Sequence, residues 1–522
     1  LQARPITSLY PIDGLASPDG SLHIYFSMSH QQNMTRAMAP LSLSSFPLLL
    51  PIGHTHSRFE ISFLHFNGGR LFLDLTLLLR HRLLRQVAFG ATAQFDALAP
   101  ETLKAAMRHP EFQGWQKARL SFSTVKFMAG FFRRIQSALW RQELTGFVAQ
   151  TNALIDQFLD EKARQLQAVP AGKAQIQALL DAMPAIFPFF LNWAPQWIAG
   201  EAAKRMLTRQ AGKWLPPEEA DALTLALPGN AVTEMNLAVG DLADAARPSP
   251  ALAAWFEQLG GTGRDWLARA ATLEGAEPFI AAWEAFIAQY GARGPAEIDI
   301  MMPRWHEAPL PILQVVANAL KRPSGSHRVQ HDKLVQAREA ATAKLLAASR
   351  GLRHRLLKRL IHVATEAGGM REHHKFVAIR FLWIVKQILR QNEALLAAQG
   401  KLACADDIWF LPWQEVLAIW DDADTDWQAR IQQRRADLER FQKLTPPLII
   451  TSDGETPAVQ YEVTGAPEGA LLGNPVSPGV VEGIVHVVHD PQVETLAPGE
   501  ILVAPYTDPG WTPLFINAAG LI

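Results

Sequence analysis

Residues 375–402 have the sequence KFVAIRFLWIVKQILRQNEALLAAQGKL, in which apolar side chains recur every three or four positions. That spacing is typical of an amphipathic helix. The same spacing occurs in residues 334–360, and a more charged version occupies residues 425–447, where Pro446-Pro447 should stop the helix. Helical patterns dominate from about residue 101 to residue 445, so the sequence predicts a mostly α fold.

Strand patterns lie on either side of this helical region. Residues 58–76 alternate apolar and polar side chains around Gly68-Gly69, which predicts a β-hairpin. Residues 473–490 and 499–508 contain β-branched runs separated by glycine and proline, as short strands do. We therefore expect a small N-terminal hairpin region before the helical domain and a β-rich α/β segment after it.

Composition excludes several classes of protein. The 522 residues are 48% hydrophobic and 19% charged, as in ordinary globular proteins of several domains. Lys plus Arg number 49 against 50 Asp plus Glu, so no overall charge favours binding to nucleic acid or to an anionic membrane. The single cysteine, Cys404, excludes an internal disulfide and a cysteine metal cluster, and it fits a reducing cytoplasm. His54 and His56 are too isolated to indicate a metal site.

One apolar stretch has to be considered as a possible membrane-spanning helix. Residues 182–200 run for 19 positions without a charge, close to the length that spans a bilayer. Pro184, Pro188 and Pro195 interrupt that stretch, and proline breaks helices. We expect a pair of short, buried or lid-like helices here rather than a membrane span.

The C-terminal strand motifs resemble a known family. Residues 474–488, NPVSPGVVEGIVHVV, followed by residues 499–515, GEILVAPYTDPGWTPLF, are similar to the swivelling phosphohistidine domain of phosphoenolpyruvate-utilising enzymes, such as phosphoenolpyruvate synthase and pyruvate phosphate dikinase. The resemblance implies a phosphorylated histidine beyond Ile522, because His30 and His327, although each follows a serine, lie in a different context. We therefore expect the chain to be an inactive piece of a longer enzyme.

The first residues, LQARPIT (1–7), resemble the closing strand of the ATP-grasp domain in the same family. The resemblance implies that Gln2 helps to hold a metal ion and that Arg4 contacts the phosphates of ATP. A guanidinium group suits such contacts with phosphate oxygens. ATP and Mg²⁺ are thus expected in the intact enzyme, with neither bound to this chain alone.

The middle of the chain resembles one branch of that family. Five segments occur in the order found in the substrate-binding domain of the rifampicin phosphotransferases, at residues 25–44, 229–247, 290–305, 371–376 and 406–412. The implied plan is an ATP-grasp remnant (1–14), a mainly helical acceptor-binding domain (15–447), a linker (448–470), which could also be an entry strand, and the start of the swivel domain (471–522).

The segment REHHKF (371–376) contains the strongest candidates for substrate contacts. On a helix, Arg371 and Lys375 lie four positions apart and project from one face. Two neighbouring cations need either an anion such as a phosphate between them or acidic neighbours. The resemblance implies that both face the substrate pocket. The sequence departs from the family pattern at His373 and His374, where an aromatic residue and a proline are usual.

Other candidates follow from the remaining segments. By resemblance, Met28 and Gln32 would line the pocket, where methionine adapts to shape and glutamine bonds hydroxyl and amide groups, whereas His30 would be structural. Arg293 and Glu297 could form a structural clamp or could contact substrate, and alanine occupies position 292 where relatives often have histidine. Segment 233–235 should begin a helical wall of the pocket, with Glu234 a candidate general base.

The resemblance implies a dikinase-type phosphotransferase. The intact enzyme would move the β-phosphate of ATP through the swivel histidine to a hydroxyl of a bulky, rifamycin-like acceptor, releasing AMP and phosphate. Two alternatives remain open: a phosphoenolpyruvate-synthase-like enzyme with a different acceptor, and a non-catalytic split binding module. The expected partners are a bulky small molecule and the missing segments of the same enzyme, with no nucleic acid and no membrane.

Overall fold

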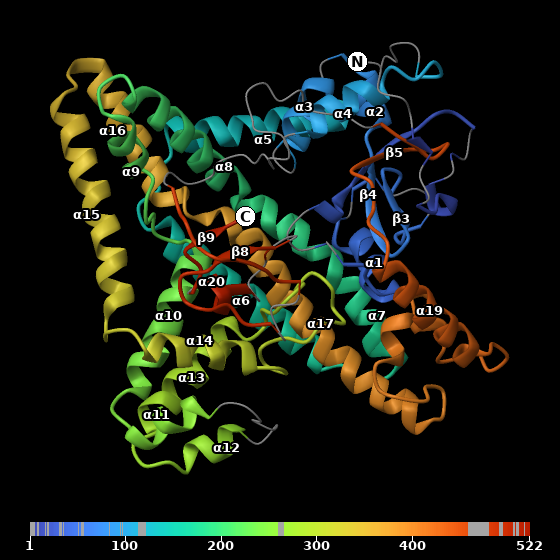
Figure 1. Cartoon of the computed structure of the whole chain (residues 1–522). Coiled ribbons are helices and arrows are strands. Elements are labelled where there is room, and N and C mark those ends of the chain that lie inside the picture. Colours follow the sequence, from blue (N-terminus) through green and yellow to red (C-terminus); the bar gives the residue numbers. More distant parts are fainter. Residues whose placement is uncertain are drawn as a thin grey trace.

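The computed structural model describes residues 6–7, 10–15, 17, 20–30, 34, 36–50, 52–53, 57–82, 84–93, 96, 98–112, 122–258, 266–457, 480–489, 494–504, 507, 511–515 and 517–522. These residues form a large helical body with small sheets at its edges (Figure 1). The strands are β1 (Ile6–Thr7), β2 (Ile24–Ser27), β3 (Leu64–Asn67), β4 (Arg70–Asp74), β5 (Ile449–Thr451), β6 (Glu455–Thr456), β7 (Val485–Val487), β8 (Ile501–Val503) and β9 (Gly520–Leu521).

The α-helices are α1 (Pro40–Leu49), α2 (Thr76–Arg80), α3 (Leu84–Thr92), α4 (Ala99–Ala106), α5 (Phe122–Trp140), α6 (Phe147–Gln167), α7 (Lys173–Ala182), α8 (Ile186–Ala211), α9 (Pro217–Ala222), α10 (Ala231–Ala246), α11 (Pro250–Glu257), α12 (Trp266–Ala271), α13 (Glu277–Tyr290), α14 (Leu310–Leu320), α15 (Ser326–Ala347), α16 (Gly351–Ala367), α17 (His373–Ala398), α18 (Trp413–Ala418), α19 (Trp427–Gln442) and α20 (Thr512–Phe515). Short 3₁₀ helices are η1 (Asp13–Leu15), η2 (Met28–His30), η3 (Met183–Ala185), η4 (Met370–Glu372) and η5 (Asp407–Phe410).

The predicted mostly α fold is confirmed, and α17 is its central helix. Its apolar residues are buried against α6, α7 and the aromatic residues of η5. Segment 334–360 forms parts of two helices, because α15 ends at Ala347 and α16 begins at Gly351, whose φ is +62°. The charged helix α19 ends at Gln442, shortly before Pro446-Pro447, as the sequence predicts.

The expectation of two short helices in residues 182–200 is wrong. After the single turn η3, the chain forms one helix of 26 residues, α8, with Pro195 inside it. Pro195 has no N–H to donate to the carbonyl of Leu191, but α8 packs along both α5 and α16, and Arg134 of α5 donates to the adjacent carbonyl of Asn192 at 2.5 Å. This tertiary packing offsets the local cost of the proline. By length and composition alone, Lys173–Ala211 could cross a membrane; in this fold it packs among other helices.

The close packing of α8 on α16 leads to a prediction. A Cβ atom added at Gly200 would lie 2.6 Å from both the carbonyl carbon of Ala367 and the amide nitrogen of Gly368. Gly200→Ala should therefore force the two helices apart and lower the free energy of unfolding by about 1–3 kcal/mol, as overpacking does, measured by urea denaturation. Gly212→Ala is the matched control, because its added Cβ meets nothing closer than 3.6 Å. Equal stability of the two variants would contradict the prediction.

The expected hairpin is confirmed and belongs to a larger sheet. Strands β3 and β4 pair around Gly68 and Gly69, whose φ values of +55° and +70° suit a tight two-residue turn. The sheet order is β3-β4-β2-β5, all antiparallel, and α2, α3 and α4 cover part of it through Leu79, Ala88 and Leu103. Strand β5 comes from the expected linker and pairs with β2, and β6 pairs with β1. Residues 448–457 are therefore built into the sheets, whereas residues 458–470 lie outside the described part of the chain.

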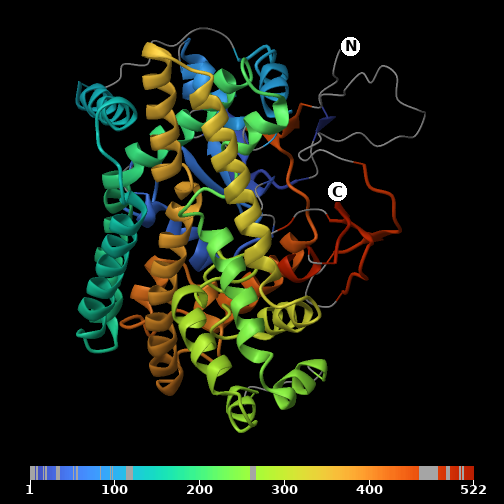
Figure 2. The same ribbon diagram turned by 90° about the vertical axis from the view of Figure 1, so that its left-hand side faces the viewer.

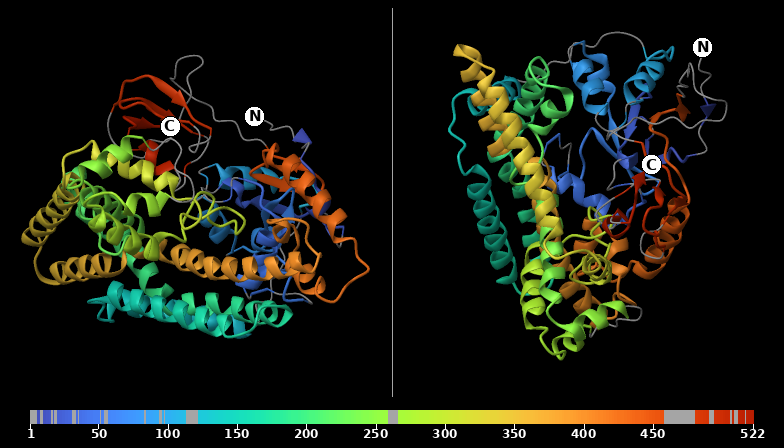
Figure 3. Two further views of the ribbon diagram at one scale, coloured as in Figure 1. Left: turned by 90° about the horizontal axis from the view of Figure 1, so that it is seen from below. Right: turned by 60° about the vertical axis from the view of Figure 1, so that its left-hand side comes forward.

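The C-terminal residues form a separate small layer. Strands β7, β8 and β9 make a parallel sheet, and Trp511 and Leu514 pack on it beside Val488 and Leu502. This confirms the short strands predicted after residue 473. Helix α20 contacts α14, so this layer (red) lies against the helical body, on the side opposite to α6 (Figures 2 and 3).

Candidate functional site

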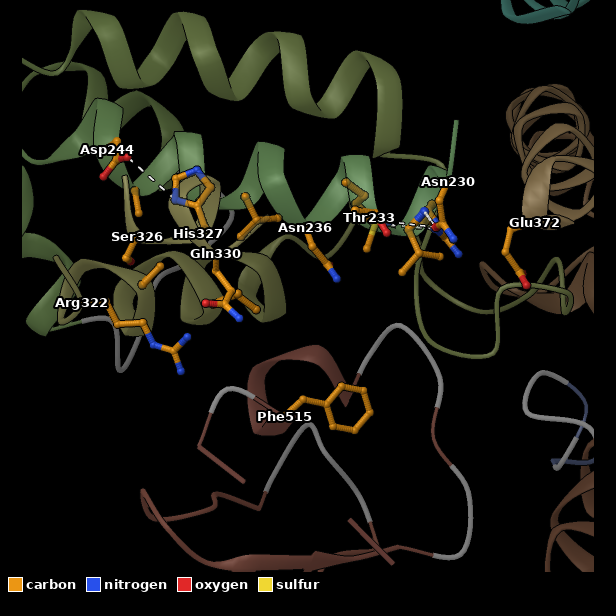
Figure 4. Close-up of a pocket in the computed structure, with 18 of the residues that line it drawn as sticks. Asn230, Thr233, Asn236, Asp244, Arg322, Ser326, His327, Gln330, Glu372 and Phe515 are labelled. Carbon is orange, nitrogen blue, oxygen red and sulfur yellow. Dashed lines mark hydrogen bonds and ion pairs between the residues drawn. The ribbon is translucent and has the colours of Figure 1, made fainter. Parts of the chain in front are cut away.

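A groove of about 1020 Å³ lies between the helical body and the C-terminal layer. One wall is α10, the others come from α14, the start of α15 and the η4–α17 junction, and Thr507 and Phe515 of the C-terminal layer face it (Figure 4). Asn230 and Glu372 lie at one end, and Asp244, Arg322 and His327 lie at the other. This volume suits a binding site for a large organic ligand.

Helix α10 presents a polar stripe to this groove. Asn230 caps the helix, since its side-chain oxygen accepts the N–H groups of Val232 and Thr233, both at 3.1 Å. Thr233, Asn236 and Gly240 then follow at helical spacing along the groove. The predicted helical wall beginning near residues 233–235 is thus present.

The cation end of the groove is organised by a buried carboxylate. Glu297 has no exposed surface and binds Arg293 at 3.0 Å and Lys375 at 2.6 Å. Burial alone would raise its pKa, but the charges of Arg293 and Lys375 lower the pKa of Glu297 to about 2. The clamp predicted between Arg293 and Glu297 is therefore present, and it also holds Lys375, a member of a different sequence segment.

Arg371 is the accessible cation of this end. It lines the groove with 67% of its side chain exposed and lies 3.2 Å from Glu372. Two neighbouring cations were expected to need either an anion between them or acidic neighbours. The structure shows acidic neighbours for both Arg371 and Lys375. The cation end thus contains three cations, Arg293, Arg371 and Lys375. It contains two carboxylates, Glu297 and Glu372. Its net charge is therefore positive, which suits a phosphoryl group.

The opposite end contains residues that sequence reasoning did not select. His327 lies 3.0 Å from a carboxylate oxygen of Asp241 and 3.9 Å from one of Asp244. Asp244 also accepts the N–H of Gly325 at 2.9 Å. Gly240 makes room for the imidazole, since a Cβ there would lie 2.4 Å from the ring. The only feature of the sequence that could have indicated this cluster is the pair Asp241 and Asp244, which lie three positions apart on one face of α10.

The structure places the other predicted residues elsewhere. Glu234 does not line the groove but lines a second, smaller cavity behind α10, together with His373. Met28 begins η2 and packs against the β-sheet clusters, away from the residues that line the groove. His374 stacks on Trp197 with ring centroids 5.9 Å apart, and Ala292 is buried. The side chain of His30 and residues Gln2, Arg4, Gln32, His54 and His56 lie outside the described part.

Three potential metal ligands come together near the sheet. His109, Asp453 and Glu455 offer ligand atoms within 4.8 Å of one another, the only such group among the described residues. Nδ1 of His109 accepts the N–H of Glu111 at 3.2 Å. In the neutral ring Nε2 therefore carries the proton and faces Asp453 at 3.3 Å, as a donor rather than as a metal ligand. We interpret this group as a contact that holds the turn between β5 and β6 to the segment that follows α4.

Comparisons with known proteins agree with the motif resemblance. Residues 192–372 match the family model described as "Rifampicin phosphotransferase fourth domain". The whole chain is 31% identical to the rifampicin phosphotransferase of Streptomyces sviceus and 28% identical to that of Bacillus subtilis, and it spans 58% and 59% of their lengths. Over 66% of the chain it is 27% identical to the prodigiosin synthesizing transferase PigC of Serratia marcescens, of which it spans 38%. The chain is thus similar along its full length to rifampicin phosphotransferases, while spanning little more than half of them.

Proposed function

We propose that this chain is the acceptor-binding part of a phosphotransferase that acts on a hydroxyl of a bulky, rifamycin-like small molecule. The observation that carries the proposal is the groove, which combines the size for a macrocycle with a cation end built from Arg293, Arg371 and Lys375. The similarity to rifampicin phosphotransferases along the whole chain supports the choice of acceptor.

The proposed chemistry is the transfer of the β-phosphate of ATP, with Mg²⁺, through a histidine of the swivel domain, releasing AMP and phosphate. Gln2 and Arg4 would contact the metal ion and the nucleotide. Within the described residues, the role of the chain is to hold the acceptor and to neutralise charge. In-line phosphoryl transfer depends mainly on positioning and electrostatic stabilisation. Arg371 would contact the phosphoryl oxygens, and Glu297 would fix Lys375 and Arg293 beside it.

The position of the C-terminal layer supports this arrangement. Phe515 and Thr507 face the same groove as the cation cluster, and Phe515 lies across from α10 (Figure 4). A phosphoryl carrier attached to this layer would therefore approach the acceptor from the open side of the groove. Gln32 would contact the distal part of a large acceptor, whereas Met28 packs against the β-sheet clusters and is left out of this contact.

Rifampicin binding by the chain tests the proposal directly. Isothermal titration calorimetry should show one saturable site with a dissociation constant in the micromolar range or tighter. Arg371→Ala and Gln32→Ala should each weaken binding about 10-fold, equivalent to about 1.4 kcal/mol. Arg164→Ala is the matched control, because that arginine is 73% exposed on α6 and pairs only with Glu161 among the described residues. A folded chain that shows no binding would contradict the rifamycin acceptor.

A second candidate is a phosphotransferase of the same kind with a different acceptor. The similarity to the prodigiosin synthesizing transferase supports it, since the matching region there belongs to a protein named for a different activity. Alanine at position 292 and histidines at positions 373 and 374 depart from the family pattern near the groove. This candidate predicts that rifampicin does not bind and that another hydroxylated molecule competes for the groove, as judged by protection of Arg371 from modification by phenylglyoxal.

A further inference from the structure

The N-terminal half of α5 exposes a group of apolar side chains. Phe122 is 83% exposed and Phe132 60%, while Val125, Phe127 and Met128 are each about half exposed. All but Phe127 recur at intervals of three or four residues, so they form one stripe along the helix. Single exposed apolar residues are normal on a protein surface, but a contiguous group of them marks an interaction site. None of these side chains lines the groove or the smaller cavity behind α10.

The C-terminal half of α5 holds the helix to the rest of the protein. Ala138 and Leu139 are buried against α8 and α16. Arg359 of α16 donates hydrogen bonds to the carbonyls of Leu139, at 2.8 Å, and of Ala138, at 2.6 Å. The helix is thus fixed by one half, and its other half presents the apolar stripe to the outside.

The same segment carries only positive charge. Residues 112–142 contain Lys or Arg at six positions and no Asp or Glu. Of these cations, Lys126, Arg133 and Arg134 are exposed on α5. Lys126 follows Phe122 by four positions and therefore lies beside the apolar stripe. The part of α8 that packs against α5 adds no acidic side chain, because residues 182–200 are uncharged.

This surface lies away from the groove. Figure 2 shows α5 on the side of the helical body opposite to the C-terminal layer. A partner bound to α5 would therefore leave the groove open to the acceptor and to a phosphoryl carrier. The expectation of no membrane partner rests on the charge of the whole chain, in which this local excess of cations is averaged out.

An anionic lipid bilayer matches both features of this surface. The apolar side chains of an interfacial helix insert at the boundary between headgroups and acyl chains, and the Lys and Arg side chains on its flanks contact the lipid phosphates. A polyanion without an apolar part would pair with the cations but would leave the stripe in water. The charge complementarity and the exposed stripe together therefore favour a lipid surface.

We propose that the N-terminal half of α5 docks the protein onto an anionic lipid bilayer, with the helix lying in the plane of the interface. Phe122, Met128 and Phe132 insert between the lipids, while Lys126 and Arg133 contact the headgroup phosphates. The inference does not depend on the proposed function, because none of these side chains takes part in acceptor binding or in phosphoryl transfer.

Co-sedimentation of the chain with lipid vesicles tests the proposal. Vesicles made of equal parts of phosphatidylserine and phosphatidylcholine should bind the chain about 10-fold more tightly than vesicles of phosphatidylcholine alone. Binding to the mixed vesicles should weaken in high salt, because salt screens the attraction between the cations and the headgroups.

Phe122→Ser and Lys126→Glu separate the apolar and the charged parts of the interaction. Both side chains are exposed, so neither change should affect the fold, which circular dichroism verifies. Each should weaken binding to the mixed vesicles about 5-fold or more. Val329→Ser and Lys333→Glu are the matched controls, because both side chains are exposed near the start of α15, beside the groove. They should leave the affinity for vesicles within about twofold of the original value.

Three results would overturn the proposal: no binding to the mixed vesicles, equal binding to both kinds of vesicle, or an affinity unchanged by the two α5 variants. The full-length phosphotransferase should bind in the same way, and its failure to do so would show that one of its other domains covers α5. Self-association that Phe122→Ser abolishes, in place of vesicle binding, would assign the stripe to a second copy of the chain.

Discussion

Replacing Glu297 by glutamine should lower the free energy of unfolding by about 3–5 kcal/mol, as breaking a buried ion pair does. Glu297 is fully buried and is held 3.0 Å from Arg293 and 2.6 Å from Lys375. Glutamine has nearly the same shape, but it leaves two cations without their shared counter-charge and points an amide N–H₂ group toward one of them. Urea denaturation of the folded chain measures the change.

The control for this substitution is Glu372→Gln, 75 positions along the chain and beside the same groove. Glu372 is 29% exposed and pairs with an exposed arginine, so its removal should change the free energy of unfolding by less than about 1 kcal/mol, as for surface pairs. If the two variants were equally stable, Glu297 would not be the residue that organises the cation end. A loss confined to Glu297→Gln would show that burial, rather than charge alone, determines the effect.

Acid titration should separate the charge of Glu297 from its packing. The pKa of its carboxyl falls from 4.5 to about 2 on folding, so the folded state binds this proton less readily than the unfolded state. The resulting stability is fully present above pH 4.5 and is lost as the pH falls toward 2. The Glu297→Gln chain lacks this contribution, and its stability should therefore fall less steeply than the original over that interval, as followed by denaturation at a series of pH values.

The regular helices could be predicted from the sequence because their signal is local. The spacing of apolar residues that predicts α17, and the prolines that follow α19, act within a few residues of the helix itself. Helix α8 could not be predicted, because Pro195 is tolerated only where α5 and α16 pack against the same helix. The segment of β5 could be predicted only as a linker or an entry strand, and its pairing could not, for a related reason: Tyr25 pairs with Ile450 across more than four hundred residues.

The candidate site shows the same division between local and distant information. Arg371 and Lys375, which the resemblance assigned to one pocket, both line the groove although Arg371 lies in η4 and Lys375 in α17, and the clamp that the spacing of Arg293 and Glu297 offered as one alternative is present. No local pattern could show that Lys375 shares that clamp, or that His327 lies between Asp241 and Asp244, because these contacts form only when separate helices pack. His373 and Lys375, by contrast, lie two positions apart on α17 and so point to nearly opposite sides of the helix, toward different cavities.

Under the proposed function, replacing Arg371 by alanine in the full-length phosphotransferase should lower the rate of phosphoryl transfer to rifampicin about 100- to 1000-fold, the usual cost of losing one charge-stabilising donor. Its stability should stay within about 0.5 kcal/mol, because exposed side chains without special contacts contribute little and this one is 67% exposed. Arg164→Ala removes an equally exposed arginine far from the groove and should leave the rate unchanged. Single-turnover transfer from the phosphorylated enzyme to rifampicin measures the step directly. A slower step, beyond the roughly 10-fold loss of rifampicin affinity, would place Arg371 on the phosphoryl group, whereas weaker affinity with an unchanged step would place it on the acceptor alone and contradict its proposed role in the transfer.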